Sequence, residues 1–147
     1  MVATVSAGSD GSAPSGGACG GAVDCAFMAL AVEISRESLA AVANEIVRLK
    51  AQYYGKGPTE AKAYLNDETL VVALKGGLTT VERTLLDAGD DALVRQVRLR
   101  FQEVMEQNFI DAVQRMTGQR VLTYMSQIVF DPDYCYEFFV LSDEKMG

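Results

Sequence analysis

Basic side chains are the residues of this chain whose types and spacing best fit binding chemistry. Arg95, Arg98 and Arg100 form a cluster, and Lys56 lies in the segment Gly55-Lys56-Gly57-Pro58. On a helix Arg95 and Arg98 share one side, where two guanidinium groups could hold a carboxylate or a small anion. The candidate ligand or partner contacts are therefore Lys56, Gly57, Pro58, Arg95 and Arg98. Ion pairing within the domain is the other interpretation of the two arginines.

The segment around Lys56 superficially resembles a phosphate-binding loop. A phosphate cradle uses backbone N–H groups at a helix N-terminus, whereas this segment follows a predicted helix, whose C-terminal end carries a negative partial charge. A glycine after the last turn and a proline three residues later are typical of a helix stop. The segment is thus expected to end a helix, with a ligand or partner contact of Lys56 as the alternative.

Catalytic residue types are scarce. The chain contains no histidine, which excludes imidazole metal ligands and Ser-His or Cys-His nucleophile pairs. Its three cysteines, Cys19, Cys25 and Cys135, lack zinc-site spacing, and free thiols fit a cytoplasmic location. Asp131 and Asp133 provide too few oxygens for a calcium site and predict a turn. We expect a non-enzyme without a metal or a cofactor.

Overall charge argues against nucleic acid as a partner. The 147 residues carry a formal net charge of -7, which opposes attraction to phosphate backbones and to anionic lipids. The apolar run at residues 26–31 is too short to cross a membrane or to act as a secretory signal. Direct membrane insertion is therefore not expected, and Met28 is an alternative start of the chain.

The longest predicted element is a helix from Asp90 to Gly118. Its apolar residues recur at steps of three and four and predict a face directed toward the core: Leu93, Val94, Val97, Phe101, Val104, Met105, Phe109, Ala112 and Met116. Arg98 and Asn108 interrupt this face, so each should have a polar partner. Leu99 and Ile110 form a second ridge, which predicts either a homodimer contact or a surface covered by loops.

The remaining patterns predict an α+β fold of two layers. Ser35 to Ser38 begin a helix, and alternating residues on both sides of Asn66-Asp67 predict a β-hairpin. Thr79 and Glu82 have capping-box spacing for a short helix, and the segments around Tyr124 and Tyr134–Leu141 predict a second hairpin. The four-stranded antiparallel sheet should carry the N-terminal, short and long helices on one face.

Residues 1–34 are rich in Gly, Ser and Ala and are expected to form a disordered tail. The single domain then covers residues 35–142, and residues 143–147 form a short C-terminal tail. Glu137 is the lone charge in an apolar strand segment. It is expected either to pair with Arg98 or Arg95 or to face outward.

Several motifs occur together in a recognisable order. They are Tyr54-Gly55-Lys56-Gly57-Pro58-Thr59, the segment Leu70–Leu74, Leu93-Val94-Arg95 with Arg98 and Phe101-Gln102, and Tyr124-Met125-Ser126-Gln127 through Phe130-Asp131-Pro132. In this combination the chain resembles the MpsC family, which is named for a component of a sodium-translocating membrane-potential-generating system. The resemblance covers about Leu39 to Leu141, and Tyr134-Cys135-Tyr136 departs from the family pattern.

The resemblance implies a soluble cytoplasmic accessory or regulatory protein without established catalytic residues. Its expected partners are a second copy of the chain and a membrane protein of a cation-transport, membrane-potential or inorganic-carbon (bicarbonate) uptake system. Two alternatives remain open. One is a domain that senses or binds a small anion such as bicarbonate or a carboxylate, and the other is a nucleic-acid-binding α+β domain.

Overall fold

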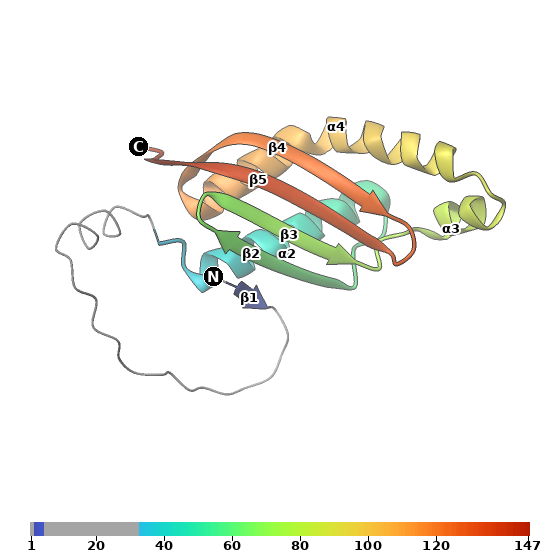
Figure 1. The fold of residues 1–147 in the computed structure, drawn as a ribbon, viewed down its shortest axis with the longest axis horizontal. Coiled ribbons are helices and arrows are strands. Elements are labelled where there is room, and N and C mark those ends of the chain that lie inside the picture. Colours follow the sequence, from blue (N-terminus) through green and yellow to red (C-terminus); the bar gives the residue numbers. More distant parts are fainter. Residues whose placement is uncertain (1, 5–32) are drawn as a thin grey trace.

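The computed structural model describes residues 2–4 and 33–147 (Figure 1). Within them the chain forms five strands and three helices. In chain order these are β1 Val2–Thr4, α2 Arg36–Tyr54, β2 Glu60–Asn66, β3 Thr69–Lys75, α3 Thr80–Asp87, α4 Asp91–Thr117, β4 Gln119–Val129 and β5 Tyr134–Lys145. All neighbouring strands pair antiparallel, in the order β1-β2-β3-β5-β4.

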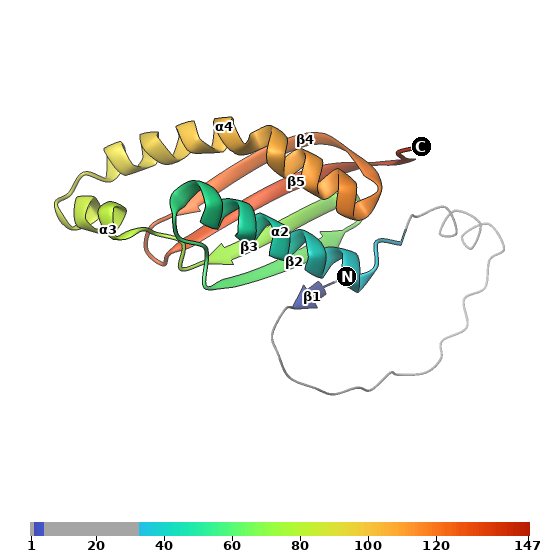
Figure 2. The same ribbon diagram turned by 180° about the vertical axis from the view of Figure 1, so that it is seen from behind.

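The predicted α+β class and the two hairpins are confirmed. The hairpins β2–β3 and β4–β5 join through the pairing of β3 with β5, so the four predicted strands form one open sheet. Helices α2 and α4 lie on one face, α2 over β2 and α4 over β4 (Figures 1 and 2). The short helix α3 packs beside α4 past the end of the sheet (Figure 2). No described helix covers the opposite face of the sheet.

Local hydrogen bonds explain where the helices begin and end. The Ser35 hydroxyl accepts the Ser38 N–H at the start of α2, and Thr79 and Glu82 form the predicted capping box of α3. Gly55 and Gly118 end α2 and α4 with φ of 75° and 72°, a left-handed conformation that glycine adopts without steric cost. These ends agree with the sequence-based prediction.

Successive side chains of the central strands point alternately into the core and toward the sheet face that no described helix covers. In β5, Cys135, Glu137, Phe139 and Leu141 are buried, whereas the residues between them are half-buried on the other side. The helices add Ile46 of α2 and Phe109 of α4 to the same core. The core therefore lies between the sheet and the two long helices.

The predicted core face of α4 is partly wrong. Leu93, Val97 and Val104 are 46%, 42% and 56% exposed, whereas Met105 and Phe109 are fully buried. The nine predicted residues span too wide an arc, because these three lie about 120° around the helix axis from the centre of the buried side. We call Leu93, Val97 and Val104 the α4 stripe.

Three further expectations are settled by the described residues. Asn108 has the polar partner that was predicted, since its Nδ2 donates to the Tyr53 hydroxyl over 2.6 Å. Val2–Thr4 were expected in a disordered tail but pair with β2, and Ile34 is buried in the core. Strand β5 continues to Lys145, so it includes part of the predicted C-terminal tail. Residues 5–32, including Cys19, Cys25 and Met28, lie outside the described residues.

Two substitutions on α4 test which side of the helix is buried. Phe109→Ala should lower the free energy of unfolding by about 3–5 kcal/mol, because it removes a fully buried ring. Val97→Ala removes atoms from an exposed position and should change stability by less than about 0.5 kcal/mol. Urea denaturation followed by circular dichroism measures both, and a loss at Val97 as large as that at Phe109 would contradict the assigned orientation.

Candidate functional site

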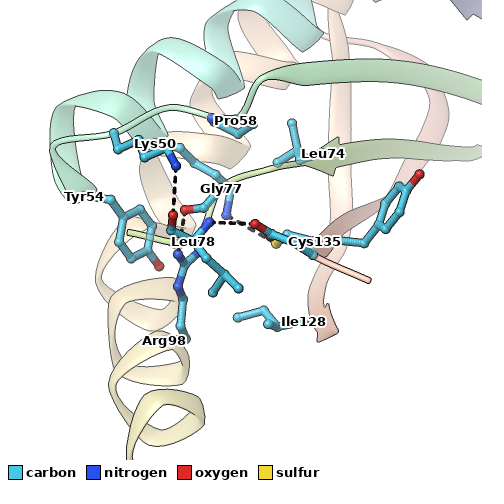
Figure 3. A pocket seen from close by; sticks show the side chains of 12 residues that line it. Lys50, Tyr54, Pro58, Leu74, Gly77, Leu78, Arg98, Ile128 and Cys135 are labelled. Atoms are coloured by element: carbon cyan, nitrogen blue, oxygen red, sulfur yellow. Dashed lines mark hydrogen bonds between the residues drawn. The ribbon is translucent and has the colours of Figure 1, made fainter. Parts of the chain in front are cut away.

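Two buried cations meet at the ring of Tyr54 in the core. Lys50 comes from α2 and Arg98 from α4, and their side chains are 3% exposed each. Lys50 Nζ lies 5.7 Å and Arg98 Cζ 4.2 Å from the centre of the Tyr54 ring, which stacks on Phe101 at 4.9 Å. Figure 3 shows Lys50, Tyr54 and Arg98 around one small cavity. Such contacts between cations and an aromatic face are favourable and strengthen when water is excluded.

Lys50 is held by a polar cluster on the inner side of the sheet. Its Nζ lies 2.6 Å from Glu137 Oε1 and donates to Cys135 Sγ at 3.4 Å. The Cys135 thiol donates to the same carboxylate oxygen, and the Tyr124 hydroxyl donates to Glu137 Oε2 at 2.6 Å. Four side chains from α2, β4 and β5 therefore satisfy one another in the core, as buried polar groups require.

Arg98 is held by a second cluster that includes the start of α3. Its guanidinium binds the Glu82 carboxylate with two nitrogens and donates to the Gly77 carbonyl oxygen at 2.8 Å. Glu82 also accepts the backbone N–H of Thr79 at 2.7 Å in the capping box. One carboxylate thus caps α3 and neutralises Arg98 of α4, which gives Arg98 the partner that the sequence required.

The pKa values follow from burial and pairing. Burial disfavours the charged form of Lys50, but the Glu137 carboxylate outweighs it, so the pKa of Lys50 lies above its ordinary value. Burial, together with the Glu137 charge, raises the pKa of the Cys135 thiol to about 12. Although burial would raise the pKa of Glu82, hydrogen bonds from Arg98 and Thr79 hold it below the ordinary value. Lys50 is therefore charged and Cys135 is a protonated thiol near neutral pH.

The cavity between the two clusters is small. It has a volume of about 10 Å³, room for about one water molecule, and its lining includes Lys50, Tyr54, Arg98 and Cys135. The Tyr54 hydroxyl is buried and has no hydrogen-bond partner within the described part of the chain, and burial raises the pKa of Tyr54 to about 12. A single water molecule would satisfy this hydroxyl. The arrangement can stabilise one water, but a substrate needs more space.

The five predicted contact residues are only partly brought together. Lys56, Pro58 and Arg98 line the cavity, and Lys56 Nζ donates to the Leu78 carbonyl oxygen at 3.0 Å. Gly57 packs near Ala51 of α2 and does not line the cavity. Arg95 points elsewhere, because it donates to the Ile128 carbonyl oxygen and lies over the Phe130 ring at 4.7 Å.

The partner expected for Glu137 is wrong. Glu137 is fully buried and pairs with Lys50, so it neither faces outward nor binds Arg98 or Arg95. The period of two along β5 turns Glu137 inward beside Cys135 and Phe139. Lys50 was missed, although it follows the apolar residues of α2 at helical spacing. The sequence signal available for this pair was a single charged residue on an apolar face of each element, Lys50 on α2 and Glu137 on β5.

The predicted dimer ridge consists of Leu99 and Ile110 on α4. Leu99 is 50% exposed and Ile110 is half-buried, so both reach the surface of the described chain. Among residues 33–147, no three or more Cys, Asp or Glu side chains lie close enough together to hold a metal ion.

Comparison with known proteins decides the family. A family model described as Na+-translocating membrane potential-generating system (MpsC) matches residues 35–143. The chain belongs to the MpsC family. No curated protein and no solved structure matches it. The match includes both buried clusters of this MpsC-family chain and leaves out β1.

The described residues of this MpsC-family chain form three helices, α2, α3 and α4. None of α2, α3 and α4 combines the length and apolar composition that crossing a bilayer requires. The family description nevertheless refers to a membrane system.

Removing one member of the buried ion pair should be strongly destabilising. Lys50→Met leaves the Glu137 carboxylate buried without its cation and should lower the free energy of unfolding by about 3–5 kcal/mol. The double variant Lys50→Met/Glu137→Gln should recover part of this loss. Lys75→Met breaks an exposed pair with Glu60 and should cost less than about 1 kcal/mol in urea denaturation. Equal losses for Lys50→Met and Lys75→Met would contradict the role of the buried pair.

The Cys135 thiol predicts a dependence of stability on alkaline pH. An unfolded thiol loses its proton near pH 8.5, whereas the folded thiol keeps it to about pH 12. The folded chain therefore binds more protons in this window, and the contribution of Cys135 is complete below pH 8.5 and falls above it. The stability difference between wild type and Cys135→Ala should shrink from pH 8 to pH 10 under reducing conditions. A constant difference would show that the thiol is not shifted.

Proposed function

We propose that this MpsC-family chain is a non-catalytic accessory or regulatory component of a sodium-translocating membrane-potential system and acts through protein contacts. The observation that carries the proposal is the α4 stripe, since Leu93, Val97 and Val104 are exposed and lie within about 40° of one another around the helix. Aligned exposed apolar side chains are typical of protein contact surfaces. The family description, which names a sodium-translocating membrane-potential-generating system, supports a membrane protein of that system as the partner. We propose cation or inorganic-carbon transport as the activity of this partner.

The buried clusters support a non-catalytic role. Lys50 is paired with Glu137, Arg98 with Glu82, and the Cys135 thiol is protonated in a cavity the size of one water. A nucleophile or general base must instead be reachable and ionised at the right pH. We also propose that the chain forms a homodimer.

A membrane pull-down tests the contact surface. The immobilised chain should retain a membrane-spanning component of a cation or inorganic-carbon transport system from native membranes, and Val97→Glu should reduce its recovery at least tenfold. The reason is that a charge placed in an apolar contact must be desolvated without a partner.

Glu103→Gln serves as the matched control, because Glu103 is an exposed α4 residue that is not part of the stripe. It should bind like wild type. If wild type retains no membrane protein, or if both variants bind equally, the proposed contact is wrong.

Binding of a small anion such as bicarbonate is a second candidate. The convergence of Lys50, Lys56 and Arg98 on one cavity supports it. Because the cavity holds about one water, it must widen on binding, and Arg98 must exchange Glu82 for the ligand. Isothermal titration calorimetry should show bicarbonate or carboxylate binding that Arg98→Ala abolishes and that Arg100→Ala leaves intact, since Arg100 is exposed and pairs with Glu103. Identical heats for wild type and Arg98→Ala would exclude this function.

A further inference from the structure

The sheet has one face that no described helix covers (Figure 1). Strand register places its outward residues in cross-strand rows. The rows are Asn66-Thr69-Val140-Thr123, Tyr64-Val71-Phe138-Met125, Lys62-Ala73-Tyr136-Gln127 and Glu60-Lys75-Tyr134-Val129. Apolar and aromatic residues occupy the middle of this face, and Met125 is 59% exposed. We call it the outer face.

The outer face has a ridge beside a groove. Tyr134, Tyr136 and Phe138 form the ridge on β5, with stacked rings whose centres are 5.8 and 6.3 Å apart. The groove has a volume of about 440 Å³ and lies over β2 and β3, where Ala73 is the smallest outward side chain and Tyr64 a bordering one. A surface with a ridge and a groove of similar size next to each other can be complementary to itself.

We propose that the outer face binds the outer face of a second copy of this chain, about a two-fold axis parallel to the strands between β3 and β5. This assigns the interface of the homodimer in the proposed function. This dimer interface can be disproved in an experiment that still finds a membrane protein bound to the α4 stripe. An axis perpendicular to the strands would instead place ridge against ridge.

The two-fold axis exchanges the positions of the strands on either side of it. Strand β5 then lies over β3 of the second copy, and β4 lies over β2. Tyr136 enters the groove above Ala73 of the second copy, and Phe138 contacts its Val71. Sheets that pack face to face in this way interdigitate at about 10 Å.

The arrangement avoids repulsion between like charges in the four cross-strand rows. The charged residues of these rows are Glu60 and Lys62 on β2 and Lys75 on β3, and Lys75 Nζ is 3.3 Å from Glu60 Oε1. The residues of β4 and β5 in the rows are uncharged, and the exposed charges Arg120 and Glu144 of those strands lie beyond the rows. The axis therefore places each charged side chain of the rows opposite a neutral one, so no like charges meet within them. Gln127 faces Lys62 of the second copy.

The area suits a dimer of modest affinity. Four strands spaced about 4.8 Å apart, each paired over seven residues of about 3.4 Å, give a face of about 450 Å² in projection. Two copies therefore bury about 900 Å² or more, close to the about 1,000 Å² expected of a specific interface. We expect a dissociation constant in the micromolar range, which makes the dimer concentration-dependent.

Sedimentation equilibrium of the full chain tests the interface. Wild type should pass from monomer to dimer between about 1 and 500 µM, because interfaces of this size lie at the small end of specific contacts and are typically weak or transient. Tyr136→Glu should raise the dissociation constant at least tenfold, because it places a charge in the groove of the second copy. Leu99→Glu, on the alternative ridge of α4, should leave the constant within twofold of wild type. Circular dichroism and thermal unfolding show that each variant folds.

Substitution of Gln127 by a charged residue tests which residues of the two copies face each other, and it leaves the core unchanged. Gln127 is exposed on the edge strand β4, and on its own chain two strands, β5 and β3, separate it from β2. Gln127→Glu faces Lys62 of the second copy and should tighten the dimer, whereas Gln127→Lys should weaken it. The two constants should differ about tenfold at low salt and converge at high salt, because exposed charges are screened.

Three results of these experiments, and one separate binding result, would overturn the proposal. These are a wild-type chain that stays monomeric at 500 µM, a dimer lost in Leu99→Glu but kept in Tyr136→Glu, and equal dissociation constants for the two variants at position 127. Binding of single-stranded RNA to the Tyr134-Tyr136-Phe138 ridge of a monomer would also overturn it, since aromatic sheet faces can stack on bases.

Discussion

The ion pair between Lys50 and Glu137 joins the two layers of this protein in its core. Lys50 belongs to the helix α2 and Glu137 to the central strand β5, and water reaches neither side chain to any useful extent. Each charge would be strongly unfavourable there without the other, so the pair forms only when α2 is seated on the sheet at one position. Tyr124 and Cys135 complete the hydrogen bonds of the carboxylate and restrict the position further.

A second pair repeats this principle between the helices. Arg98 of α4 binds Glu82, which also forms the capping box of α3 with Thr79, so the start of the short helix is tied to the long one. Both cations contact the ring of Tyr54, which connects the clusters. Buried polar networks of this kind add little net stability compared with apolar packing, but they can favour one arrangement over similar ones. We interpret both clusters as devices that position the helices.

This architecture leaves two kinds of surface available for binding. The helices occupy one face of the sheet, α4 exposes the stripe of Leu93, Val97 and Val104, and the outer face exposes the aromatic ridge. The proposed action through protein contacts requires such surfaces more than it requires a cleft. The proposed roles divide them, with the stripe for a membrane protein and the outer face for a second copy.

Local interactions determined most of what could be predicted from the sequence. The Ser35 cap, the Thr79 and Glu82 capping box and the glycines that end α2 and α4 act within a few residues, so their signals lie close together in the chain. The family motifs were also visible. Tertiary structure alone decided which polar groups meet, because Lys50 and Cys135 are 85 residues apart and their contact depends on how α2 docks on β5. It likewise decided which side of α4 is buried, since a broad apolar arc on a helix fits the core equally well in more than one rotation until the sheet and α2 cover one side of it.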